Sequence, residues 1–426
     1  MRAYSTDWLD KAIFLRHIFG MLAKRSFLIL GAVVGYVTSF VASGEEAKIN
    51  GPVLSWHLDP TKTMTISWIE HTKGGKGQDI SKIEVRQGES PRWVKFDVET
   101  RPFADTGHLV RSVVLDKLKP SMEYEFRLPS QYADRSGKFR TAPADSSKPV
   151  RFVTGGDMFH TRELLDAMNV RAGEEDPLFA LLGGDLAYAN AKNDKKWYEW
   201  VESWQQNAVT PSGFMIPMIV AIGNHETITP GAWVPPNVRP PKSAKYFYSF
   251  FLTPEKYKSN YSVDFGDYMS IVILDSNHTQ TVVSQTAWLA RQLEKRQNSP
   301  ALFVCYHRPT YGTGVKKNDL GVRTEWVPLF EKFGVDTVFE NDHHTYKRTL
   351  PLRKGEVEEG GVMFMGDGAW GVRTRKIPKE THDLPYMATA QEKRHLIVVE
   401  VQGEEISYLA KEADGTVIDR YPSEGE

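Results

Sequence analysis

Five short apolar runs between residues 150 and 346 are followed by side chains that commonly bind metal ions. Each run predicts a buried strand, because it is short, apolar and closed by glycine or a polar residue. The five segments are Gly155-Gly156-Asp157, Gly184-Asp185-Leu186-Ala187-Tyr188, Gly223-Asn224-His225-Glu226, Val304-Cys305-Tyr306-His307 and Asn341-Asp342-His343-His344-Thr345-Tyr346. Open α/β sheets bind their ligands just beyond the carboxyl ends of strands. We therefore expect these segments to form one site.

The donor groups in these segments suit hard or borderline metal ions. Carboxylate, amide and imidazole groups bind such ions, and the chain has one cysteine, Cys305, which excludes a cysteine-based site. Two metals about 4 Å apart are a common arrangement for in-line displacement at phosphorus. Each segment also has a structural explanation: Asp157 could cap a helix, and Asn224 could occupy a turn. Such explanations would require five independent coincidences, so we favour a dinuclear metal site.

Together the five segments resemble the motifs of the calcineurin-like metallophosphoesterase superfamily, specifically those of the purple acid phosphatase type. That pattern reads GDxG, GDxxY, GNH(D/E), VxxH and GHxH, and the segments follow the same order. The family pattern also has an N-terminal fibronectin-III-like domain. The resemblance covers the chain from about Ile49 to its end, and the combination of GDxxY with GNHE is its most specific part.

The resemblance implies a role for each motif residue. The implied metal ligands are Asp157, Tyr188 and His344 for a first metal, Asn224 and His307 for a second, and Asp185 as the bridge between them. The implied cofactors are two metal ions: iron together with a second iron, zinc or manganese. Tyr188 would bind ferric iron as a phenolate. Asp185 and His225 would be the catalytic residues, with His225 donating to the phosphate or to the leaving-group oxygen.

The chain departs from the family pattern at two positions. Phe159 replaces the second glycine of the first motif, which leaves Asp157 in place. In the last motif, alignment on His344 puts Asp342 where the family has a histidine ligand of the second metal. Asp342 can bind a metal, but it adds a negative charge and prefers harder ions. Our hypothesis is that Asp342 or, after a shift of the loop, His343 completes the second site, with preference moved toward manganese or iron.

Basic residues near the last two motifs are candidates for phosphate contacts. Where the family tends to place histidines, the loop after His307 offers Lys316 and Lys317. An exposed basic turn explains these lysines about as well as a phosphate contact does. Asn224 and His225 complete the predicted substrate-binding set, and Arg373 and Arg375 are further candidates.

Two kinds of strand pattern divide the chain. Before residue 143, alternating strands separated by turns predict a small β-sandwich. The predicted strands are Thr63–Trp68, Ile83–Arg86, Trp93–Val98, Leu109–Leu115 and Glu123–Leu128. After the linker Ala142–Pro149, strands alternate with helices and predict an α/β domain. The resemblance implies a fibronectin-III-like β-sandwich over 45–147, then a four-layer α/β/β/α metallophosphoesterase domain over 148–426.

The N-terminal residues have the features of an export signal. Lys24 and Arg25 precede an apolar run, Ser26–Ala42, and small residues follow at Ser43 and Gly44. The predicted export segment is 1–44, with an uncleaved N-terminal anchor as the alternative. Either form places the protein in the periplasm or outside the cell. The net charge of −1 gives no electrostatic reason to expect nucleic acid as a partner.

The function implied by the resemblance is a phosphoric ester hydrolase of the acid phosphatase type. A metal-bound hydroxide would attack phosphorus in line, and the substrate would be a small phosphate ester. One alternative is a phosphodiesterase or nucleotide hydrolase on the same site, a choice that the loop Thr229–Lys242 would decide. The other is a non-catalytic phosphate-binding relative, for which Asp342 is the argument.

Overall fold

The computed structural model describes residues 47–132, 135–227, 238–316 and 321–423. The predicted export segment 1–44, Lys317 and most of the loop Thr229–Lys242 lie outside these ranges. Within them, no helix has both the length and the apolar character needed to cross a membrane.

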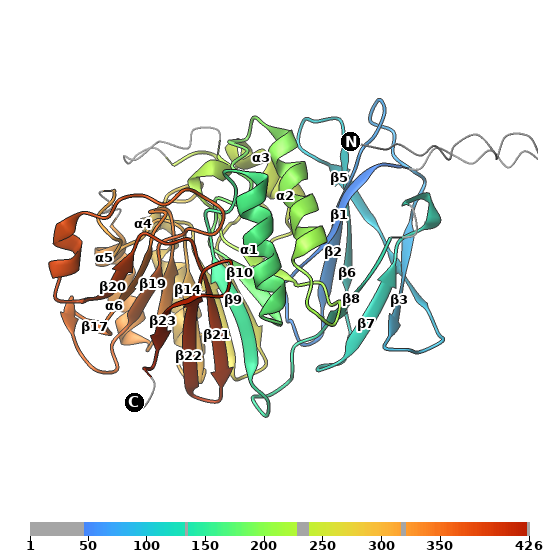
Figure 1. The fold of residues 1–426 in the computed structure, drawn as a ribbon. Helices are drawn as coiled ribbons and strands as arrows, with labels where there is room; N and C mark the ends of the chain where they lie inside the picture. Colours follow the sequence, from blue (N-terminus) through green and yellow to red (C-terminus); the bar gives the residue numbers. More distant parts are fainter. Residues whose placement is uncertain (1–46, 133–134, 228–237, 317–320, 424–426) are drawn as a thin grey trace, which may run out of the picture. The chain divides into compact units, whose positions relative to one another are not determined.

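The larger sheet of the described chain contains strands from both ends of the sequence (Figure 1). Its order is β23-β22-β21-β9-β10-β11-β1-β2-β6-β5. The strands are β1 (Ile49–Ser55), β2 (Met64–Glu70), β5 (Glu99–Pro102), β6 (Leu109–Leu115), β9 (Val150–Gly155), β10 (Phe179–Leu182), β11 (Met218–Val220), β21 (Leu396–Gln402), β22 (Glu405–Lys411) and β23 (Val417–Tyr421). Strands β9, β10 and β11 are parallel, so their carboxyl ends lie at the same edge.

The second large sheet has the order β12-β13-β14-β15-β19-β16-β20. Its strands are β12 (Tyr261–Phe265), β13 (Met269–Ile273), β14 (Ala301–Cys305), β15 (Thr337–Glu340), β16 (Tyr346–Thr349), β19 (Met363–Gly366) and β20 (Met387–Gln391). Strands β13, β14, β15 and β19 are parallel. A small hairpin joins β17 (Leu352–Arg353) to β18 (Glu356–Val357).

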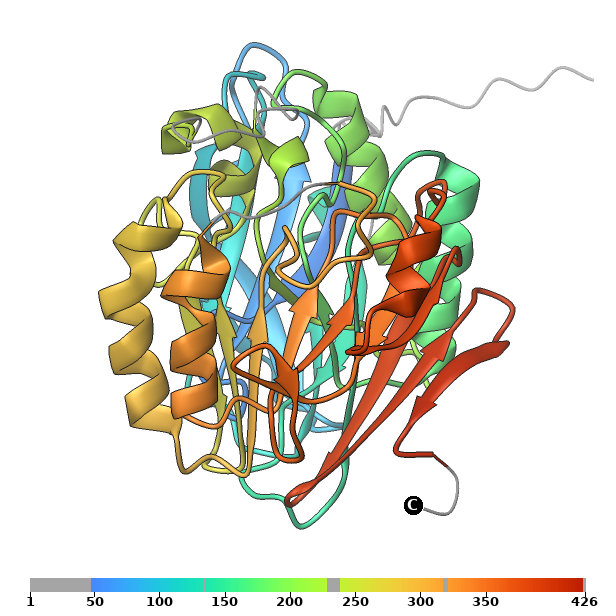
Figure 2. The ribbon, with the colours of Figure 1, turned by 90° about the vertical axis from the view of Figure 1, so that its left-hand side faces the viewer.

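Three hydrophobic cores separate four layers, as the family resemblance implies. Between the two large sheets, Phe152 contacts Phe303 with 5.6 Å between ring centroids. Helices cover the outer face of each sheet (Figure 2). Those on the larger sheet are α1 (Arg162–Glu174), α2 (Asp194–Asn207) and α3 (Lys245–Phe250); those on the second are α4 (Val282–Arg296), α5 (Val322–Glu325) and α6 (Val327–Lys332). Short 3₁₀ helices are η1 (Ser130–Tyr132), η2 (Asn224–Glu226), η3 (Pro241–Ala244) and η4 (Lys379–Asp383).

The N-terminal strands pack as two layers, but one layer belongs to the larger sheet. The other layer is a sheet of order β4-β3-β7-β8. Its strands are β3 (Lys82–Gln87), β4 (Val94–Asp97), β7 (Glu123–Arg127) and β8 (Ser136–Arg140). Strand β1 pairs in parallel with β11 at Ser55 and Met218, so one sheet continues across the predicted domain boundary. The boundary at 147/148 itself remains a prediction.

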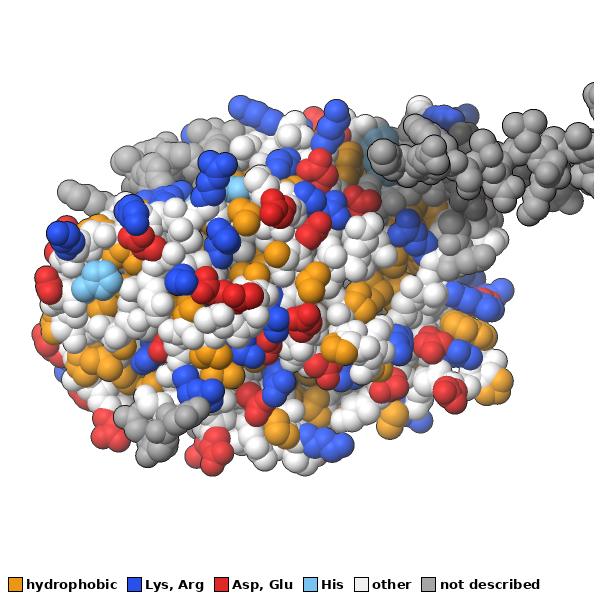
Figure 3. Space-filling model, in the orientation of Figure 1, with side chains coloured by type: hydrophobic (Ala, Val, Ile, Leu, Met, Phe, Trp, Pro, Cys, Tyr) orange, Lys and Arg blue, Asp and Glu red, His pale blue; other side chains and the backbone are white. Residues whose placement is uncertain are grey.

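Two elements differ from the sequence prediction for identifiable reasons. The sequence predicts one helix over Thr324–Phe333, but the structure interrupts it at Trp326, because Pro328 has no N–H to continue the helical hydrogen bonds. Strand β1 was not predicted, because Gly51 and Pro52 break its pattern, and its register shifts between Asn50 and Val53. On the face drawn in Figure 3, acidic and basic side chains are interspersed.

Candidate metal centre

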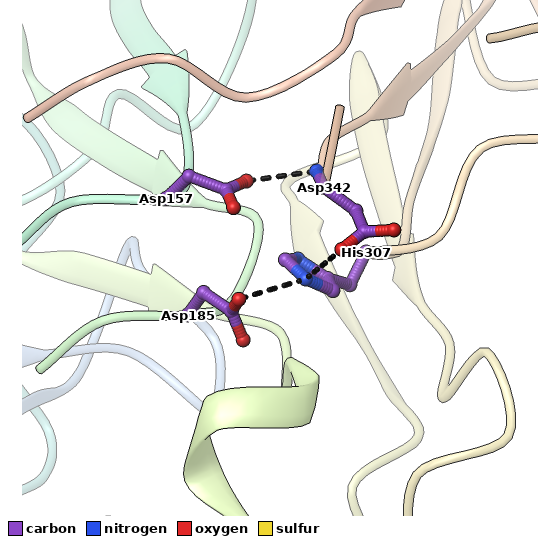
Figure 4. A group of neighbouring side chains, drawn as sticks. All are labelled: Asp157, Asp185, His307 and Asp342. Atoms are coloured by element: carbon purple, nitrogen blue, oxygen red, sulfur yellow. Dashed lines mark hydrogen bonds and ion pairs between the residues drawn. The ribbon is translucent and has the colours of Figure 1, made fainter. Parts of the chain in front are cut away.

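The sequence-predicted ligands meet where the two large sheets face each other at their carboxyl edges. Asp157 follows β9, Asp185 follows β10, His307 follows β14 and Asp342 follows β15. Each offers a ligand atom, and these atoms all lie within 4.8 Å of one another (Figure 4). All four side chains are buried. A buried group of three carboxylates and one imidazole is unfavourable without cations, and this is the donor set that metal ions take.

The backbone of the ligand loops is held in an unusual conformation. Asp157, Asp185, Tyr188, Asp342 and His344 have φ angles of 56°, 51°, 52°, 76° and 61°, in the left-handed region. Non-glycine residues adopt this region at an energetic cost, and such residues cluster at functional sites. The tight turns point consecutive side chains in directions that a regular strand or helix would not allow. The ligand geometry is therefore built into the backbone of the loops.

Two glycines allow the ligand loops to approach one another closely. A Cβ atom on Gly183 would lie 1.8 Å from the Asn341 side-chain nitrogen, and one on Gly223 would lie 2.3 Å from Asp185 Oδ1. Neither position can accommodate a larger residue without moving a site loop. Gly183 and Gly223 are therefore explained by the close packing of the ligand loops.

One half of the site is centred on Asp157. The Tyr188 hydroxyl donates to Asp157 Oδ1 at 2.9 Å, and His344 Nε2 lies 2.9 Å from the same oxygen. The Tyr188 hydroxyl oxygen lies 3.0 Å from His344 Nε2. The backbone N–H of Asp342 donates to Asp157 Oδ2 at 2.8 Å, which links this half to the other. The three residues predicted for the first metal are therefore neighbours.

The other half is centred on His307. Its Nδ1 lies 2.9 Å from the carbonyl oxygen of Gly183 and donates to it, so Nε2 faces the carboxylates as a potential ligand. His307 Nε2 is 3.3 Å from Asp185 Oδ2 and 3.6 Å from Asp342 Oδ1. The Asp185 carboxylate thus lies close to ligand atoms of both halves (Figure 4).

Several buried polar atoms of the predicted ligands have no hydrogen-bond partner. They are Asp185 Oδ2, Asn224 Oδ1, His307 Nε2 and Asp342 Oδ2. Buried polar atoms are normally satisfied, so a group of unsatisfied ones calls for an explanation. All four are atoms that bind metal ions through a lone pair. The residues present therefore fit a metal centre.

The pKa shifts of His307 and Asp342 also show that positive charge is favourable beside these carboxylates. Burial opposes charge on His307, but Asp185 and Asp157 raise the pKa of its imidazole well above the usual range. Burial also opposes charge on Asp342, but His307 and Lys316 hold the pKa of its carboxyl well below the usual range. The Asp342 carboxyl thus favours its charged form and the His307 imidazole its protonated form, and a bound cation would take the place of that proton.

His225 lies beside the group with its orientation fixed. Its backbone N–H donates to Asp185 Oδ1 at 2.7 Å, and its Nδ1 is 2.6 Å from Asn190 Oδ1. Its ring stacks on Tyr188 with 4.1 Å between centroids. The remaining nitrogen, Nε2, is 3.8 Å from Asp185 Oδ2 and faces the group.

The loop after β15 places Asp342, and not His343, among the ligand atoms. His343 Nδ1 is 3.3 Å from Asp367 Oδ2 and 3.3 Å from the Thr313 hydroxyl. Its ring packs so closely on Gly312 that a Cβ there would lie 2.4 Å from His343 Cε1. Of the two residues left open by the sequence, only Asp342 belongs to the group shown in Figure 4.

Two of the basic candidates reach the site. Lys316 Nζ lies 2.5 Å from Asp342 Oδ1. Arg375 Nη1 donates to the Asp342 carbonyl oxygen at 3.0 Å, and its Nη2 is 3.4 Å from His344 Nε2. Arg373 is exposed, and only its backbone approaches, through a carbonyl oxygen 3.3 Å from His344 Nδ1. Arg375 is therefore the better placed of the two arginines.

Sequence reasoning missed two supporting residues. Glu226 is buried, and its carboxylate accepts from the backbone N–H groups of Asp185, Leu186 and Gly223 at 2.8, 2.9 and 2.7 Å. Burial and the nearby Asp185 raise the pKa of Glu226 to about 7. Its place in the GNHE motif was the signal that could have identified it. Asn190, which contacts His225, has no sequence signal beyond its position two residues after Tyr188.

Comparison with known proteins agrees with this geometry. The calcineurin-like phosphoesterase family model matches residues 151–346. An uncharacterized protein of Mycobacterium tuberculosis is 28% identical over 369 residues, which cover 77% of this chain and 63% of that protein. Purple acid phosphatase 18 of Arabidopsis thaliana is 24% identical over 332 residues, which cover 72% of this chain and 68% of that protein. The chain thus spans 63% of the length of its mycobacterial relative.

A solved structure shows the same fold. The purple acid phosphatase from yellow lupin (Lupinus luteus) seeds superposes with a TM-score of 0.71 at 18% identity, covering 88% of this chain and 74% of that one. Residues 151–346 thus match the calcineurin-like phosphoesterase family, and the fold is similar to that of a purple acid phosphatase. These findings support the predicted resemblance to purple acid phosphatase-like metallophosphoesterases.

Proposed function

We propose that this protein hydrolyses phosphate esters with two metal ions held by the residues described above. Asp157, Tyr188 and His344 are the proposed ligands of the first metal, and Asn224, His307 and Asp342 are those of the second, with Asp185 as the bridge. Two ions bound there would acidify the attacking water and neutralise the phosphoryl oxygens. The observation that carries the proposal is the set of unsatisfied buried atoms on Asp185, Asn224, His307 and Asp342.

The protein's own side chains would then position the substrate and handle its protons. His225 Nε2 faces the group, and its imidazolium form would donate to the leaving-group oxygen. Asn190 fixes the ring in that orientation. Asn224, Lys316 and Arg375 are proposed to contact the phosphate, with Lys317 as a further candidate from the sequence. Preorganised charges of this kind provide most of the stabilisation needed for phosphoryl transfer.

The finer parts of the proposal concern substrate, metal and location. We propose a small phosphate monoester as the substrate, iron with a second iron, zinc or manganese as the metals, and export from the cytoplasm. Tyr188 supports iron, because a phenolate is a hard oxygen ligand that suits ferric iron, and the resulting complex would absorb visible light. A membrane attachment would come only through the N-terminal segment. Diester and nucleotide hydrolysis remain the alternatives that the first experiment should separate.

Metal content and hydrolysis should be measured together on the purified full-length chain. The protein would be prepared without chelator, analysed for metal, and assayed with p-nitrophenyl phosphate and bis-p-nitrophenyl phosphate. We expect about two metals per chain and faster hydrolysis of the monoester. Asp185→Asn should lower both metal content and rate. Visible absorption that is lost in Tyr188→Phe would identify ferric iron.

Other results would point elsewhere. Preferential hydrolysis of the diester would replace the substrate assignment and leave the site intact. Fewer than two metals after reconstitution with iron, manganese and zinc, together with phosphate binding and no turnover, would favour the non-catalytic relative. One observation favours the non-catalytic relative: the ion pair between Lys316 and Asp342 places a protein cation beside the second site.

A further inference from the structure

The two carboxylate oxygens of Asp342 have different environments. Oδ1 lies 2.5 Å from Lys316 Nζ, whereas Oδ2 is buried and makes no hydrogen bond. The Asp342 side chain is 1% exposed and that of Lys316 is 17% exposed. Oδ1 also lies 3.6 Å from His307 Nε2, so the carboxylate joins Lys316 to the ligand group and keeps lone pairs on Oδ2 that no protein donor occupies.

The structure holds the loop that carries Lys316 in place. The Thr313 N–H donates to Asp367 Oδ2 at 2.8 Å, and the Thr381 hydroxyl donates to the Thr313 carbonyl oxygen at 2.8 Å. Gly312 packs against the ring of His343, directly after Asp342 in the chain. The loops after β14 and β15 are thus fastened to each other on the side of His343, and the ion pair of Lys316 with Asp342 joins them on the side of the site.

The charge of the site explains why such a pair is needed. The family pattern has a neutral imidazole where this chain has Asp342, so the substitution adds one negative charge to a group that already contains Asp157 and Asp185. Uncompensated charge is strongly unfavourable in a buried site. Lys316 adds one positive charge at the same oxygen, so Asp342 and Lys316 together carry no net charge, as an imidazole would.

We propose that Asp342 and Lys316 act as one neutral ligand unit in place of the family's histidine. The Asp342 carboxylate would bind the second metal while it stays paired with Lys316. Lys316 is then a positioning residue that sets the charge of the second site, in addition to any contact with phosphate. The inference rests on the proposed dinuclear centre.

The unit predicts that histidine can replace Asp342 without loss of metal affinity only if Lys316 is replaced as well. Asp342→His alone would supply an imidazole but leave Lys316 facing the metals, so the added positive charge should weaken binding of the second ion. Asp342→His with Lys316→Gln would restore a neutral ligand without the extra cation. Lys316→Gln alone leaves a more negative site, which should bind the second ion at least as tightly as the wild type.

The test is a double-mutant cycle with metal affinity as the readout. Full-length wild type, Asp342→His, Lys316→Gln and the double variant would be titrated with Mn²⁺, followed by its release to a chelator. Asp342→His should weaken binding of the second Mn²⁺ about tenfold or more, and the double variant should recover most of that loss. Lys376→Gln is the matched control, because Lys376 pairs with Glu392 at 2.6 Å but is 93% exposed.

Each other outcome overturns the inference. If the single variant Asp342→His binds the second Mn²⁺ as well as the double variant does, Lys316 does not set the charge of the site. A rise in the inhibition constant of inorganic phosphate in Lys316→Gln, with no coupling in metal affinity, would make Lys316 a phosphate contact only. If Lys316→Gln fails to fold, Lys316→Arg is measured instead. It keeps the positive charge, so its affinity for the second Mn²⁺ should equal that of the wild type. A wild type that binds fewer than two Mn²⁺ would overturn the proposed function itself.

Discussion

The carboxylate of Glu226 accepts a hydrogen bond from the backbone N–H of Asp185 at 2.8 Å. The same oxygen accepts from the Gly223 N–H at 2.7 Å, so one side chain ties the loop after β10 to the loop after β11. Glu226 does not belong to the group of ligand atoms, yet it fixes the backbone that presents Asp185, the proposed bridging residue. Residues that orient metal ligands in this way contribute strongly to metal affinity.

We expect Glu226→Gln to lower metal affinity about 10- to 100-fold. The glutamine side chain has an amide nitrogen in place of one carboxylate oxygen, and that nitrogen cannot accept a hydrogen bond from the backbone N–H groups of Asp185, Leu186 or Gly223. Metal content after dialysis against a weak chelator would measure this. Glu199→Gln, on an exposed position of α2, is the control and should retain the metal. Unchanged affinity in Glu226→Gln would show that the loops after β10 and β11 hold Asp185 without it.

Removal of Arg375 should weaken phosphate binding more than folding. Its guanidinium lies beside Asp342 and His344. Loss of a hydrogen bond to a charged group corresponds to about 1.5–3 kcal/mol, so Arg375→Ala should raise KM for p-nitrophenyl phosphate about tenfold or more. Arg373→Ala, two residues away with an exposed side chain, should leave KM unchanged. Equal effects of the two variants would contradict a specific contact by Arg375.

The buried ion pair of Lys347 with Glu340 should be essential for stability. The two charged groups are 2.6 Å apart and both side chains are 0% exposed. Lys347→Met would leave the Glu340 carboxylate buried with only neutral donors, the Tyr306 hydroxyl and the backbone N–H groups of Thr310 and Tyr311. We expect a loss of about 3–5 kcal/mol in the free energy of unfolding.

Equilibrium unfolding in guanidinium chloride would measure that loss. The matched control is Lys393→Met, because Lys393 and Glu412 form a 2.7 Å pair at the surface. Such an exposed pair should contribute less than about 1 kcal/mol. Similar losses in both variants would show that burial of the Lys347 pair does not determine its contribution.

Asp336 should make the protein less stable as pH rises from about 4 to about 6. Burial raises the pKa of its carboxyl from 3.8 to about 6, although the Leu302 N–H donates to Oδ2 at 2.7 Å. Because the folded-state pKa is the higher one, the folded chain binds the extra proton in this window. The stability present below pH 4 is therefore lost as pH rises through 6, and a difference of about two in pKa corresponds to about 3 kcal/mol.

Asp336→Asn tests this contribution, because its amide oxygen can still accept from Leu302. The variant should unfold at a higher temperature than the wild type at pH 7.5, and the difference should become small at pH 4. Thermal unfolding followed by circular dichroism at both pH values would measure it. A difference that is the same at both values would exclude the titration of Asp336 as its cause.

The sequence alone determined the α/β class of the second half and the residue types at the strand ends. Apolar runs closed by glycine are local signals, and Leu109–Leu115 and Phe179–Leu182 form strands over the predicted residues. The order of the five motifs then indicated which side chains should share a site. These features follow from periodicity and turn chemistry, which neighbouring residues carry.

Only the tertiary structure placed Asp342, and not His343, in the cluster of candidate ligands, because adjacent side chains point in different directions and the backbone at Asp342 is left-handed. It also decided that Lys316 meets Asp342, a contact between two loops 26 residues apart in the chain. The pairing of β1 with β11 is of the same kind. Such contacts depend on how distant segments pack together, and no local pattern in the sequence records them.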